Sequence, residues 1–123
     1  MFDKLRRANG LGSLLLVVGL AWGASTWLRE RDQQTWVQAV QGQARPGDLQ
    51  LLSSQTCSYC DRARAWLTRH DIPFNECFIE HDTACRQRFE ATGARGTPTV
   101  LVRDQVQLGF DPQRVAAALG AVR

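Results

Sequence analysis

The chain lacks a basic arm or stripe. Its 15 Lys and Arg are interleaved with 12 Asp and Glu, and the net charge is only +3. Clustered basic residues are the usual electrostatic mark of nucleic-acid binding, so the composition predicts no nucleic-acid partner. No internal repeat or low-complexity tract is visible, and 123 residues suffice for one small domain.

Cysteine is also scarce, and the whole set is Cys57, Cys60, Cys77 and Cys85. Four cysteines are too few for a disulfide-dense scaffold, and they do not form the two close pairs of a four-cysteine zinc site. We therefore expect no metal site. The two histidines, His70 and His81, stand at the expected end of one helix and before another, where they suit local hydrogen bonds better than ligation.

Charge is absent altogether from residues 8–28. As a helix, these 21 residues would extend roughly 31 Å, about the thickness of a bilayer core. Trp22 and Trp27 would suit the membrane interface. We expect a transmembrane anchor at 8–28, preceded by a basic N-terminus at 1–7. A buried core helix is the alternative, but so small a domain could not surround one.

A cleaved signal peptide would show the same order of basic start, apolar stretch and small residues. We favour an uncleaved anchor because the apolar character continues through Trp27 and Leu28. More basic residues precede the segment than follow it. The positive-inside rule therefore predicts a single-pass protein of the inner membrane with its C-terminal domain outside the cytoplasm.

Residues 29–48 are polar, rich in Gln, and end in the turn signature Arg45-Pro46-Gly47-Asp48. We expect a linker or stalk there. Trp36, Val37 and Val40 have helical spacing, so the first part could extend the membrane helix or dock on the following domain.

Residues 49–123 alternate short apolar runs with amphipathic segments. We expect strands at 49–53, 74–79, 99–102 and 106–108, and helices at 58–69, 83–91 and 112–120. Pro73 and Gly93 end two helices, Asp111-Pro112 begins the last and Gly120 closes it. The order predicts an α/β fold of the thioredoxin type, a four-stranded mixed sheet with helices on both faces.

Cys57 and Cys60 stand where the first strand gives way to the first helix. A thiol attacks a disulfide as a thiolate, yet a free cysteine with a pKa of about 8.5 is mostly protonated at neutral pH. The unpaired N–H groups and dipole of a helix N-terminus lower such a pKa to about 3.5–7.5. We expect Cys57 to attack and Cys60 to resolve the mixed disulfide. A structural disulfide or half of a metal site is the alternative, and the later Thr97-Pro98 favours the redox pair.

With these residues the sequence resembles the glutaredoxin family. Cys57-Ser58-Tyr59-Cys60 matches the dithiol active-site motif, and Gly96-Thr97-Pro98-Thr99-Val100 matches the cis-proline segment. Gly109-Phe110-Asp111-Pro112 stands where the family turns into its last helix. The resemblance implies a cis Thr97–Pro98 bond beside Cys57 and a backbone at Thr97 that pairs with a thiol substrate or glutathione. The substrate-binding or glutathione-binding residues it implies are Gln55, Tyr59, Thr97, Pro98, Gly109, Phe110 and Asp111.

Two positions depart from the glutathione-using pattern. Gln55 stands where those members often carry Lys, and Gly109-Phe110-Asp111 where they often carry Gly-Gly before acidic residues. The sequence Gly109-Phe110-Asp111 is more similar to that of glutaredoxin-like redoxins, which accept electrons from thioredoxin reductase. We expect no required cofactor, with glutathione as a candidate co-substrate whose carboxylate Arg88 or Arg95 could hold.

Cys77 and Cys85 fall in the second strand and in the first turn of the next helix. Outside the cytoplasm, a disulfide closing this short loop would stabilise the domain by about 2–3 kcal/mol. Two unrelated buried cysteines are the alternative.

The sequence thus predicts a membrane-tethered, glutaredoxin-like thiol–disulfide oxidoreductase that acts on disulfide-containing proteins or glutathione conjugates. Two other hypotheses are a glutathione-dependent carrier of a 2Fe–2S cluster and a redoxin that donates electrons to a reductase.

Overall fold

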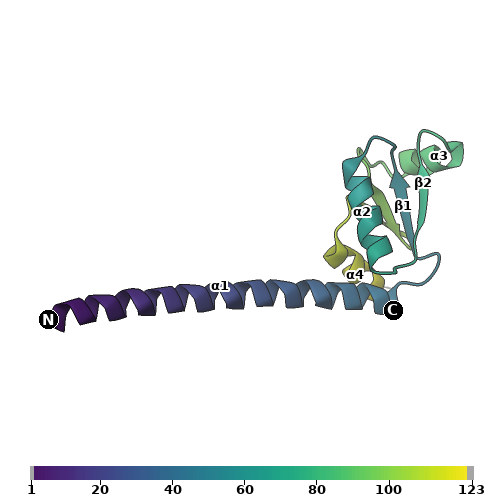
Figure 1. Cartoon of the computed structure of the whole chain (residues 1–123). Coiled ribbons are helices and arrows are strands. Elements are labelled where there is room, and N and C mark those ends of the chain that lie inside the picture. Colours follow the sequence, from purple (N-terminus) through teal and green to yellow (C-terminus); the bar gives the residue numbers. More distant parts are fainter. Residues whose placement is uncertain (1, 122–123) are drawn as a thin grey trace. The chain divides into compact units, whose positions relative to one another are not determined.

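The computed structural model describes residues 2–121, and the side chains of residues 10–120. In chain order its elements are α1 (Phe2–Gln43), β1 (Leu49–Ser53), α2 (Ser58–Arg69), β2 (Asn75–Phe78), α3 (Thr83–Ala91), β3 (Thr99–Val102), β4 (Gln105–Leu108) and α4 (Pro112–Ala121) (Figure 1). The chain divides into two compact units between Thr35 and Trp36, and each is described by itself. The side chains of the expected basic N-terminus, residues 1–7, lie outside the described part.

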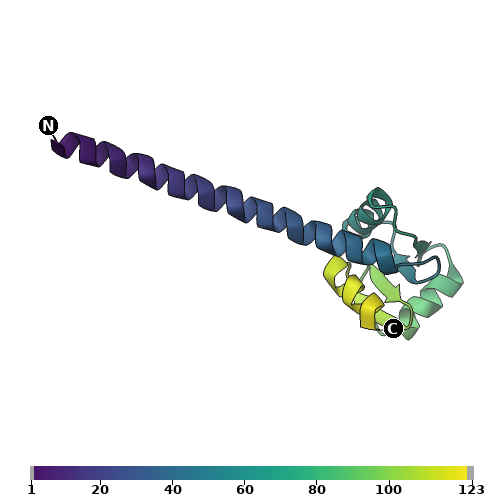
Figure 2. The same cartoon turned by 90° about the horizontal axis from the view of Figure 1, so that it is seen from below.

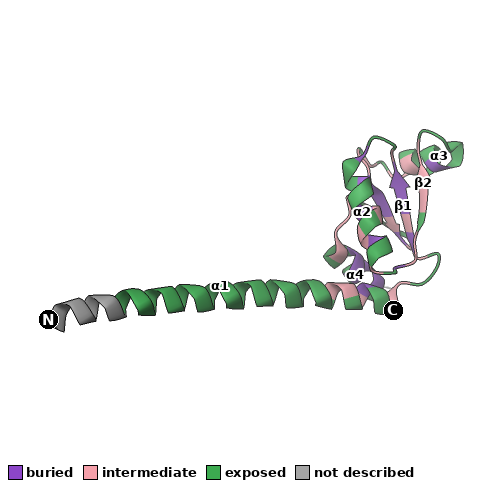
Figure 3. Cartoon of the chain, in the orientation of Figure 1, coloured by how far each residue is buried: buried purple, intermediate pink, exposed green. Residues whose placement is uncertain are grey.

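The first unit is helical throughout its described residues and contains the uncharged stretch 8–28. By length and composition, a window within Gly10–Gln43 can cross a membrane, and none of that window is buried. Large apolar side chains such as Leu15 and Trp22 are about three-quarters exposed, at 73% and 75%. Figure 3 shows this exposure along α1.

The second unit begins inside α1. Val40 is fully buried, and Trp36 and Ala39 pack against the same core. The expected linker at 29–48 is therefore helical as far as Gln43, and its last turns belong to the folded domain. The turn that follows has Gly47 at a φ of +92°, a conformation that favours glycine.

Four strands form one mixed sheet in the order β2-β1-β3-β4. β1 runs parallel to β2 and antiparallel to β3, and β3 is antiparallel to β4. β2 is shorter than the expected 74–79 because its ladder with β1 covers only Asn75–Phe78, opposite Gln50–Ser53. The hairpin partner β4 begins one residue earlier than expected, since Gln105 pairs with Val102.

One face of the sheet carries the hydrophobic core. Leu51 and Val100 are paired neighbours on this face, and they pack with Leu67 of α2 and Leu119 of α4. Alternate residues of the strands point to the opposite face, among them the fully buried Leu52 and Thr99, and α3 covers part of that face (Figures 1 and 2). Figures 1 and 2 show α4 and α3 on opposite sides of the strands. The predicted thioredoxin-like sheet with helices on both faces is confirmed.

α3 is attached to the sheet mainly by specific bonds. Among its described residues only Cys85 is buried, and the core cluster contains no residue of this helix. A disulfide joins Cys85 to Cys77 of β2, and Arg88 Nη1 donates to Gln50 Oε1 at 2.6 Å. Removing the disulfide would therefore take away the covalent anchor of α3.

The last helix begins as expected. Asp111 Oδ1 accepts the backbone N–H of Gln113 at 3.0 Å, and Pro112 is the first helical residue. Gly120 was expected to end this helix, but it lies within α4, which continues to Ala121.

Candidate functional site

Cys57 is the N-cap residue of α2. Its backbone is extended, with φ −116° and ψ 104°, and its Sγ accepts the backbone N–H of Cys60 at 3.1 Å. This is the geometry in which orphan N–H groups at a helix start turn toward the capping side chain. A thiolate at Cys57 would receive the same hydrogen bond.

The two sulfurs form a disulfide with a Cα–Cα distance of 5.2 Å, and they differ in access. Cys57 is 9% exposed, whereas Cys60 is fully buried at 0%. Tyr59, between them, is 67% exposed. Cys57, although mostly buried, is therefore the cysteine of the pair that is open to a substrate, and Cys60 is not.

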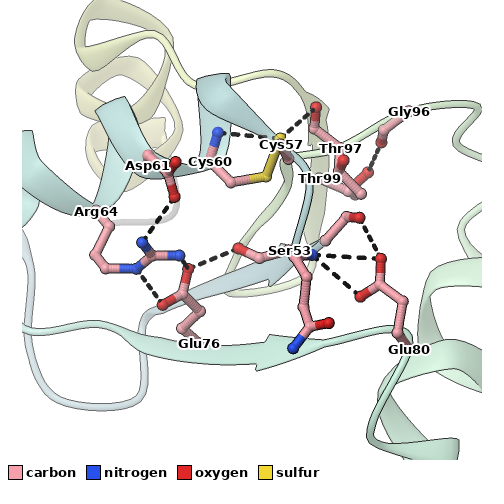
Figure 4. Close-up of a disulfide and its surroundings, with 12 residues drawn as sticks. Ser53, Cys57, Cys60, Asp61, Arg64, Glu76, Glu80, Gly96, Thr97 and Thr99 are labelled. Carbon is pink, nitrogen blue, oxygen red and sulfur yellow. Dashed lines mark hydrogen bonds and ion pairs between the residues drawn. A yellow bond between two sulfur atoms is a disulfide. The ribbon is translucent and has the colours of Figure 1, made fainter.

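A second segment borders the pair. The Thr97–Pro98 peptide bond is cis, and the carbonyl oxygen of Thr97 lies 3.4 Å from Cys57 Sγ (Figure 4). A Cys57 thiol could donate its S–H across this distance, while in the disulfide the two atoms are in contact. Thr99 Oγ1 donates to the Gly96 carbonyl at 2.8 Å, and the Gly109 N–H donates to the Pro98 carbonyl at 2.8 Å. These bonds attach the segment to itself and to the end of β4.

A groove of about 530 Å³ opens beside this segment. Its lining residues come from α2, the cis-proline segment, the end of β4 and the start of α4, and they are Tyr59, Arg62, Ala63, Trp66, Thr97, Pro98, Leu108, Gly109, Phe110, Pro112 and Arg114. The rings of Trp66 and Phe110 are 5.4 Å apart at their centroids. The groove is thus mainly apolar, with two arginines on its wall.

Known proteins share sequence with the part of the chain that contains Cys57, Cys60 and Thr97-Pro98. Residues 49–107 match the family model described as Glutaredoxin. The glutaredoxin-like protein NrdH of Lactococcus lactis subsp. cremoris (strain MG1363) is 30% identical over 66 residues, which are 54% of this chain and 92% of that protein. The chain belongs to the glutaredoxin family. Its Cys57–Cys60 pair makes it, in general terms, a thiol–disulfide oxidoreductase.

A second relative agrees with this family assignment, and a solved structure has the same fold. The glutaredoxin-like protein NrdH of Lactococcus lactis subsp. lactis (strain IL1403) is 27% identical over 66 residues, again 54% of this chain and 92% of that protein. A solved mutant of the thioredoxin-like protein BC3987 is 21% identical, with a TM-score of 0.54 over 60% of this chain and 96% of that one. The likeness to BC3987 shows a shared fold.

The glutaredoxin fold brings most of the expected binding residues together. Five of them line the groove, namely Tyr59, Thr97, Pro98, Gly109 and Phe110. Gln55 and Asp111 are not part of the lining. The backbone of Gln55 bonds to Glu80, and Asp111 caps α4 and pairs with Arg114 at 3.6 Å.

The cations of the groove are Arg62 and Arg114, neither of which the sequence singled out. Arg88, expected as a carboxylate-binding residue, donates instead to Gln50. Positions 59, 62, 63 and 66 follow the i, i+3, i+4, i+7 spacing of one helical face, so Arg62 and Trp66 could have been placed with Tyr59. No local signal places Arg114 there, because its position depends on the turn between β4 and α4.

A polar network ties α2 to the sheet behind the active pair (Figure 4). Arg64 donates to Glu76 through Nε at 2.6 Å and Nη2 at 2.8 Å, and to Asp61 at 2.9 Å. The fully buried Ser53 hydroxyl donates to Glu76 at 2.7 Å. The hydrogen bond to Glu76 is the main cause that raises the pKa of Arg64 above its ordinary value, although burial opposes it. The network therefore holds the α2 helix that Cys57 caps against β1 and β2.

Proposed function

We propose that this glutaredoxin-family protein is a membrane-tethered thiol–disulfide oxidoreductase in which Cys57 attacks the substrate disulfide and Cys60 resolves the intermediate. The observation that carries the proposal is the asymmetry of the pair. Cys57 is the more exposed cysteine, and its Sγ accepts the Cys60 N–H at 3.1 Å, while Cys60 is fully buried. A stabilised, reachable sulfur suits attack, and a buried one suits the intramolecular second step.

The reaction consists of two thiol–disulfide exchanges, each of which forms one S–S bond and breaks another. The Cys57 thiolate attacks one sulfur of the substrate disulfide, so one S–S bond forms while another breaks, and the other substrate sulfur leaves as a thiolate. The Cys60 thiolate then attacks Cys57 and expels the remaining substrate thiolate. The substrate gains the two electrons that the cysteine pair loses, and the protein is left with the Cys57–Cys60 disulfide.

The mainly apolar lining of the groove, with its two arginines, suits a peptide-like substrate. Apolar walls at Trp66 and Phe110 can take a side chain next to the substrate cysteine, and Arg62 can meet a carboxylate. We propose disulfide-containing proteins or glutathione conjugates as substrates, with Thr97 and Pro98 beside the reacting sulfur. Glutathione acts as a co-substrate and no further cofactor is required.

The proposed tether is the uncharged segment 8–28 of α1. Exposed leucines and tryptophans over this length are costly in water and stable in a bilayer core. The distribution of basic residues favours a C-terminal domain outside the cytoplasm of an inner membrane. Reporter enzymes fused to the C-terminus test this: a reporter active only outside the cytoplasm should work, and activity of a cytoplasm-only reporter would contradict it.

Turnover of a small disulfide by two matched variants tests the chemistry. Cys57→Ser should abolish turnover in the full-length protein. Cys60→Ser should still react once with the disulfide and then stop unless a thiol such as glutathione releases the product. Turnover by Cys57→Ser at the wild-type rate would refute the proposal.

A further inference from the structure

The Glu80 carboxylate binds the loop that carries Cys57. The backbone N–H of Gln55 donates to both of its oxygens, at 3.3 Å to Oε1 and 3.2 Å to Oε2, and the Ser54 hydroxyl donates to Oε1. Ser54 and Gln55 lie between β1 and α2, immediately upstream of Cys57. Figure 4 shows Glu80 with the dashed hydrogen bonds that join it to the loop after Ser53.

These hydrogen bonds also lower the pKa of the Glu80 carboxyl group. The hydrogen bond from Ser54 is the main cause that lowers the pKa of Glu80, and the N–H of Gln55 and nearby His81 act in the same direction. Glu80 is therefore an ionised acceptor at neutral pH, which suits charge-assisted hydrogen bonds to the loop.

Glu80 lies inside the ring that the Cys77–Cys85 disulfide closes, with a sequence separation of 8. The ring is a compact turn: the N–H groups of His81 and Asp82 donate to the Phe78 carbonyl at 3.2 and 3.1 Å. Asp82 then caps α3 by accepting the Cys85 N–H at 3.2 Å. The last residues of this ring, Thr83 to Cys85, belong to α3, which contributes no residue to the core cluster, so the disulfide limits where Glu80 can lie.

We propose that Glu80 is a positioning residue for Cys57, and that the disulfide ring 77–85 places it. This inference rests on the proposed function of Cys57. By fixing Ser54 and Gln55, Glu80 keeps Cys57 in the extended N-cap conformation in which its sulfur receives the Cys60 N–H. The second cysteine pair thereby takes part in the reactivity of the first without exchanging electrons with it.

The first test compares Glu80→Ala with Glu80→Gln in the full-length protein, after selective reduction of Cys57–Cys60. The readouts are the rate at which iodoacetamide alkylates Cys57 and the pH midpoint of that rate. Glu80→Ala should raise the midpoint by about half to one unit and slow alkylation near neutral pH about three- to tenfold. Glu80→Gln should restore most of the rate, because its amide oxygen can still accept the Gln55 N–H.

Glu90→Ala is the matched control, since Glu90 is an exposed carboxylate of α3 outside the ring. It should leave both readouts unchanged. If Glu80→Ala and Glu80→Gln instead accelerate alkylation equally, Glu80 acts only through its charge and the positioning role is wrong. Equal rates in the wild type and Glu80→Ala would also overturn it.

The second test removes the ring with Cys77→Ser/Cys85→Ser. This variant should slow alkylation of Cys57 about as much as Glu80→Ala, and adding Glu80→Ala should change little more, because both act through the same contact. Fully additive effects would show that the ring does not place Glu80. Circular dichroism checks folding. If the double variant is unfolded, the cycle of Ser54→Ala with Glu80→Ala tests the positioning contact itself: non-additive effects on alkylation are expected, and additive effects would overturn the positioning role.

Different results would reject the positioning role of Glu80 and the attacking role of Cys57. A wild-type alkylation rate in Glu80→Ala, together with inactive Cys57→Ser, would reject the positioning role and leave the proposed function standing. Continued turnover by Cys57→Ser would reject the proposed function, whatever the Glu80 variants do.

Discussion

The sulfur of Cys57 lies 3.4 Å from the carbonyl oxygen of Thr97, although the two residues are 40 positions apart in the chain. This contact joins the two motifs of the site, the cysteine pair at the start of α2 and the cis-proline segment before β3. The site therefore exists only when β1 and β3 are paired, and interactions that fix the cis-proline segment should matter to both stability and turnover.

Thr99 provides one such interaction. It is fully buried, and its hydroxyl donates to the Gly96 carbonyl at 2.8 Å. Thr99→Val keeps the shape but removes the donor, which should lower the free energy of unfolding by about 1 kcal/mol. Urea unfolding measures this, and an unchanged midpoint would contradict the structural role given to this bond.

The Cys77–Cys85 disulfide should contribute substantially to stability. Loss of the ring in Cys77→Ser/Cys85→Ser should lower the free energy of unfolding by about 2–3 kcal/mol, through the added entropy of the unfolded chain. Denaturant unfolding of the oxidised proteins measures the difference. Repeating it with a strong reductant is the control, because the wild type and the variant should then unfold alike, and a difference that persists would show another cause.

Asp48 should make the domain sensitive to acid. The Arg45 N–H, at 2.9 Å, is the main cause that lowers the pKa of Asp48 below its ordinary 3.8; burial opposes it and Arg103 assists it. A pKa lowered by folding gives stability that is complete above the ordinary value and is lost as the pH falls through the folded value.

Unfolding free energies measured from pH 6 to pH 2, about two units on each side of the ordinary carboxyl range, test this linkage. Wild-type stability should fall on acidification, and Asp48→Asn should flatten the decline. Asp104→Asn, at an exposed position in the turn between β3 and β4, is the matched control and should follow the wild type. Equal slopes for the wild type and Asp48→Asn would rule out this contribution.

Arg62 should contribute to substrate binding through the groove. Arg62→Ala should raise KM for an acidic peptide disulfide about three- to tenfold with little change in kcat, as expected for loss of one exposed charge-assisted contact. Arg69→Ala is a control on the same helix, outside the groove lining. Steady-state kinetics check this, and equal effects at Arg62 and Arg69 would indicate a general charge effect.

Local patterns were sufficient to predict much of this fold. The β1 and α2 boundaries follow from an apolar run, a capping position and the Asp71-Ile72-Pro73 stop, and they place Cys57 at a helix start. The cysteine motif and Thr97-Pro98 could likewise be recognised one by one. Their contact could be expected only through the family resemblance, because it forms between strands that are distant in sequence.

The features that local patterns could not predict depend on contacts between segments that are distant in the sequence. The Gln-rich composition of 29–48 suggested a linker, and the helical spacing of Trp36 and Val40 indicated that it could dock on the domain, but tertiary packing decides that Val40 is fully buried. Glu80 meets Gln55 across 25 positions, and nothing in the sequence around either residue indicates that pairing. Such pairings depend on sheet register and turn geometry, which periodicity does not encode.

The most direct test of Cys57 as the attacking cysteine is to trap the mixed disulfide that it forms with a substrate. Full-length Cys60→Ser, incubated with a substrate disulfide and digested without reduction, should yield a mixed disulfide that mass spectrometry locates at Cys57, with Cys77–Cys85 intact. A substrate adduct found at Cys77 or Cys85, or none at Cys57, would contradict the assignment of Cys57 as the attacking sulfur.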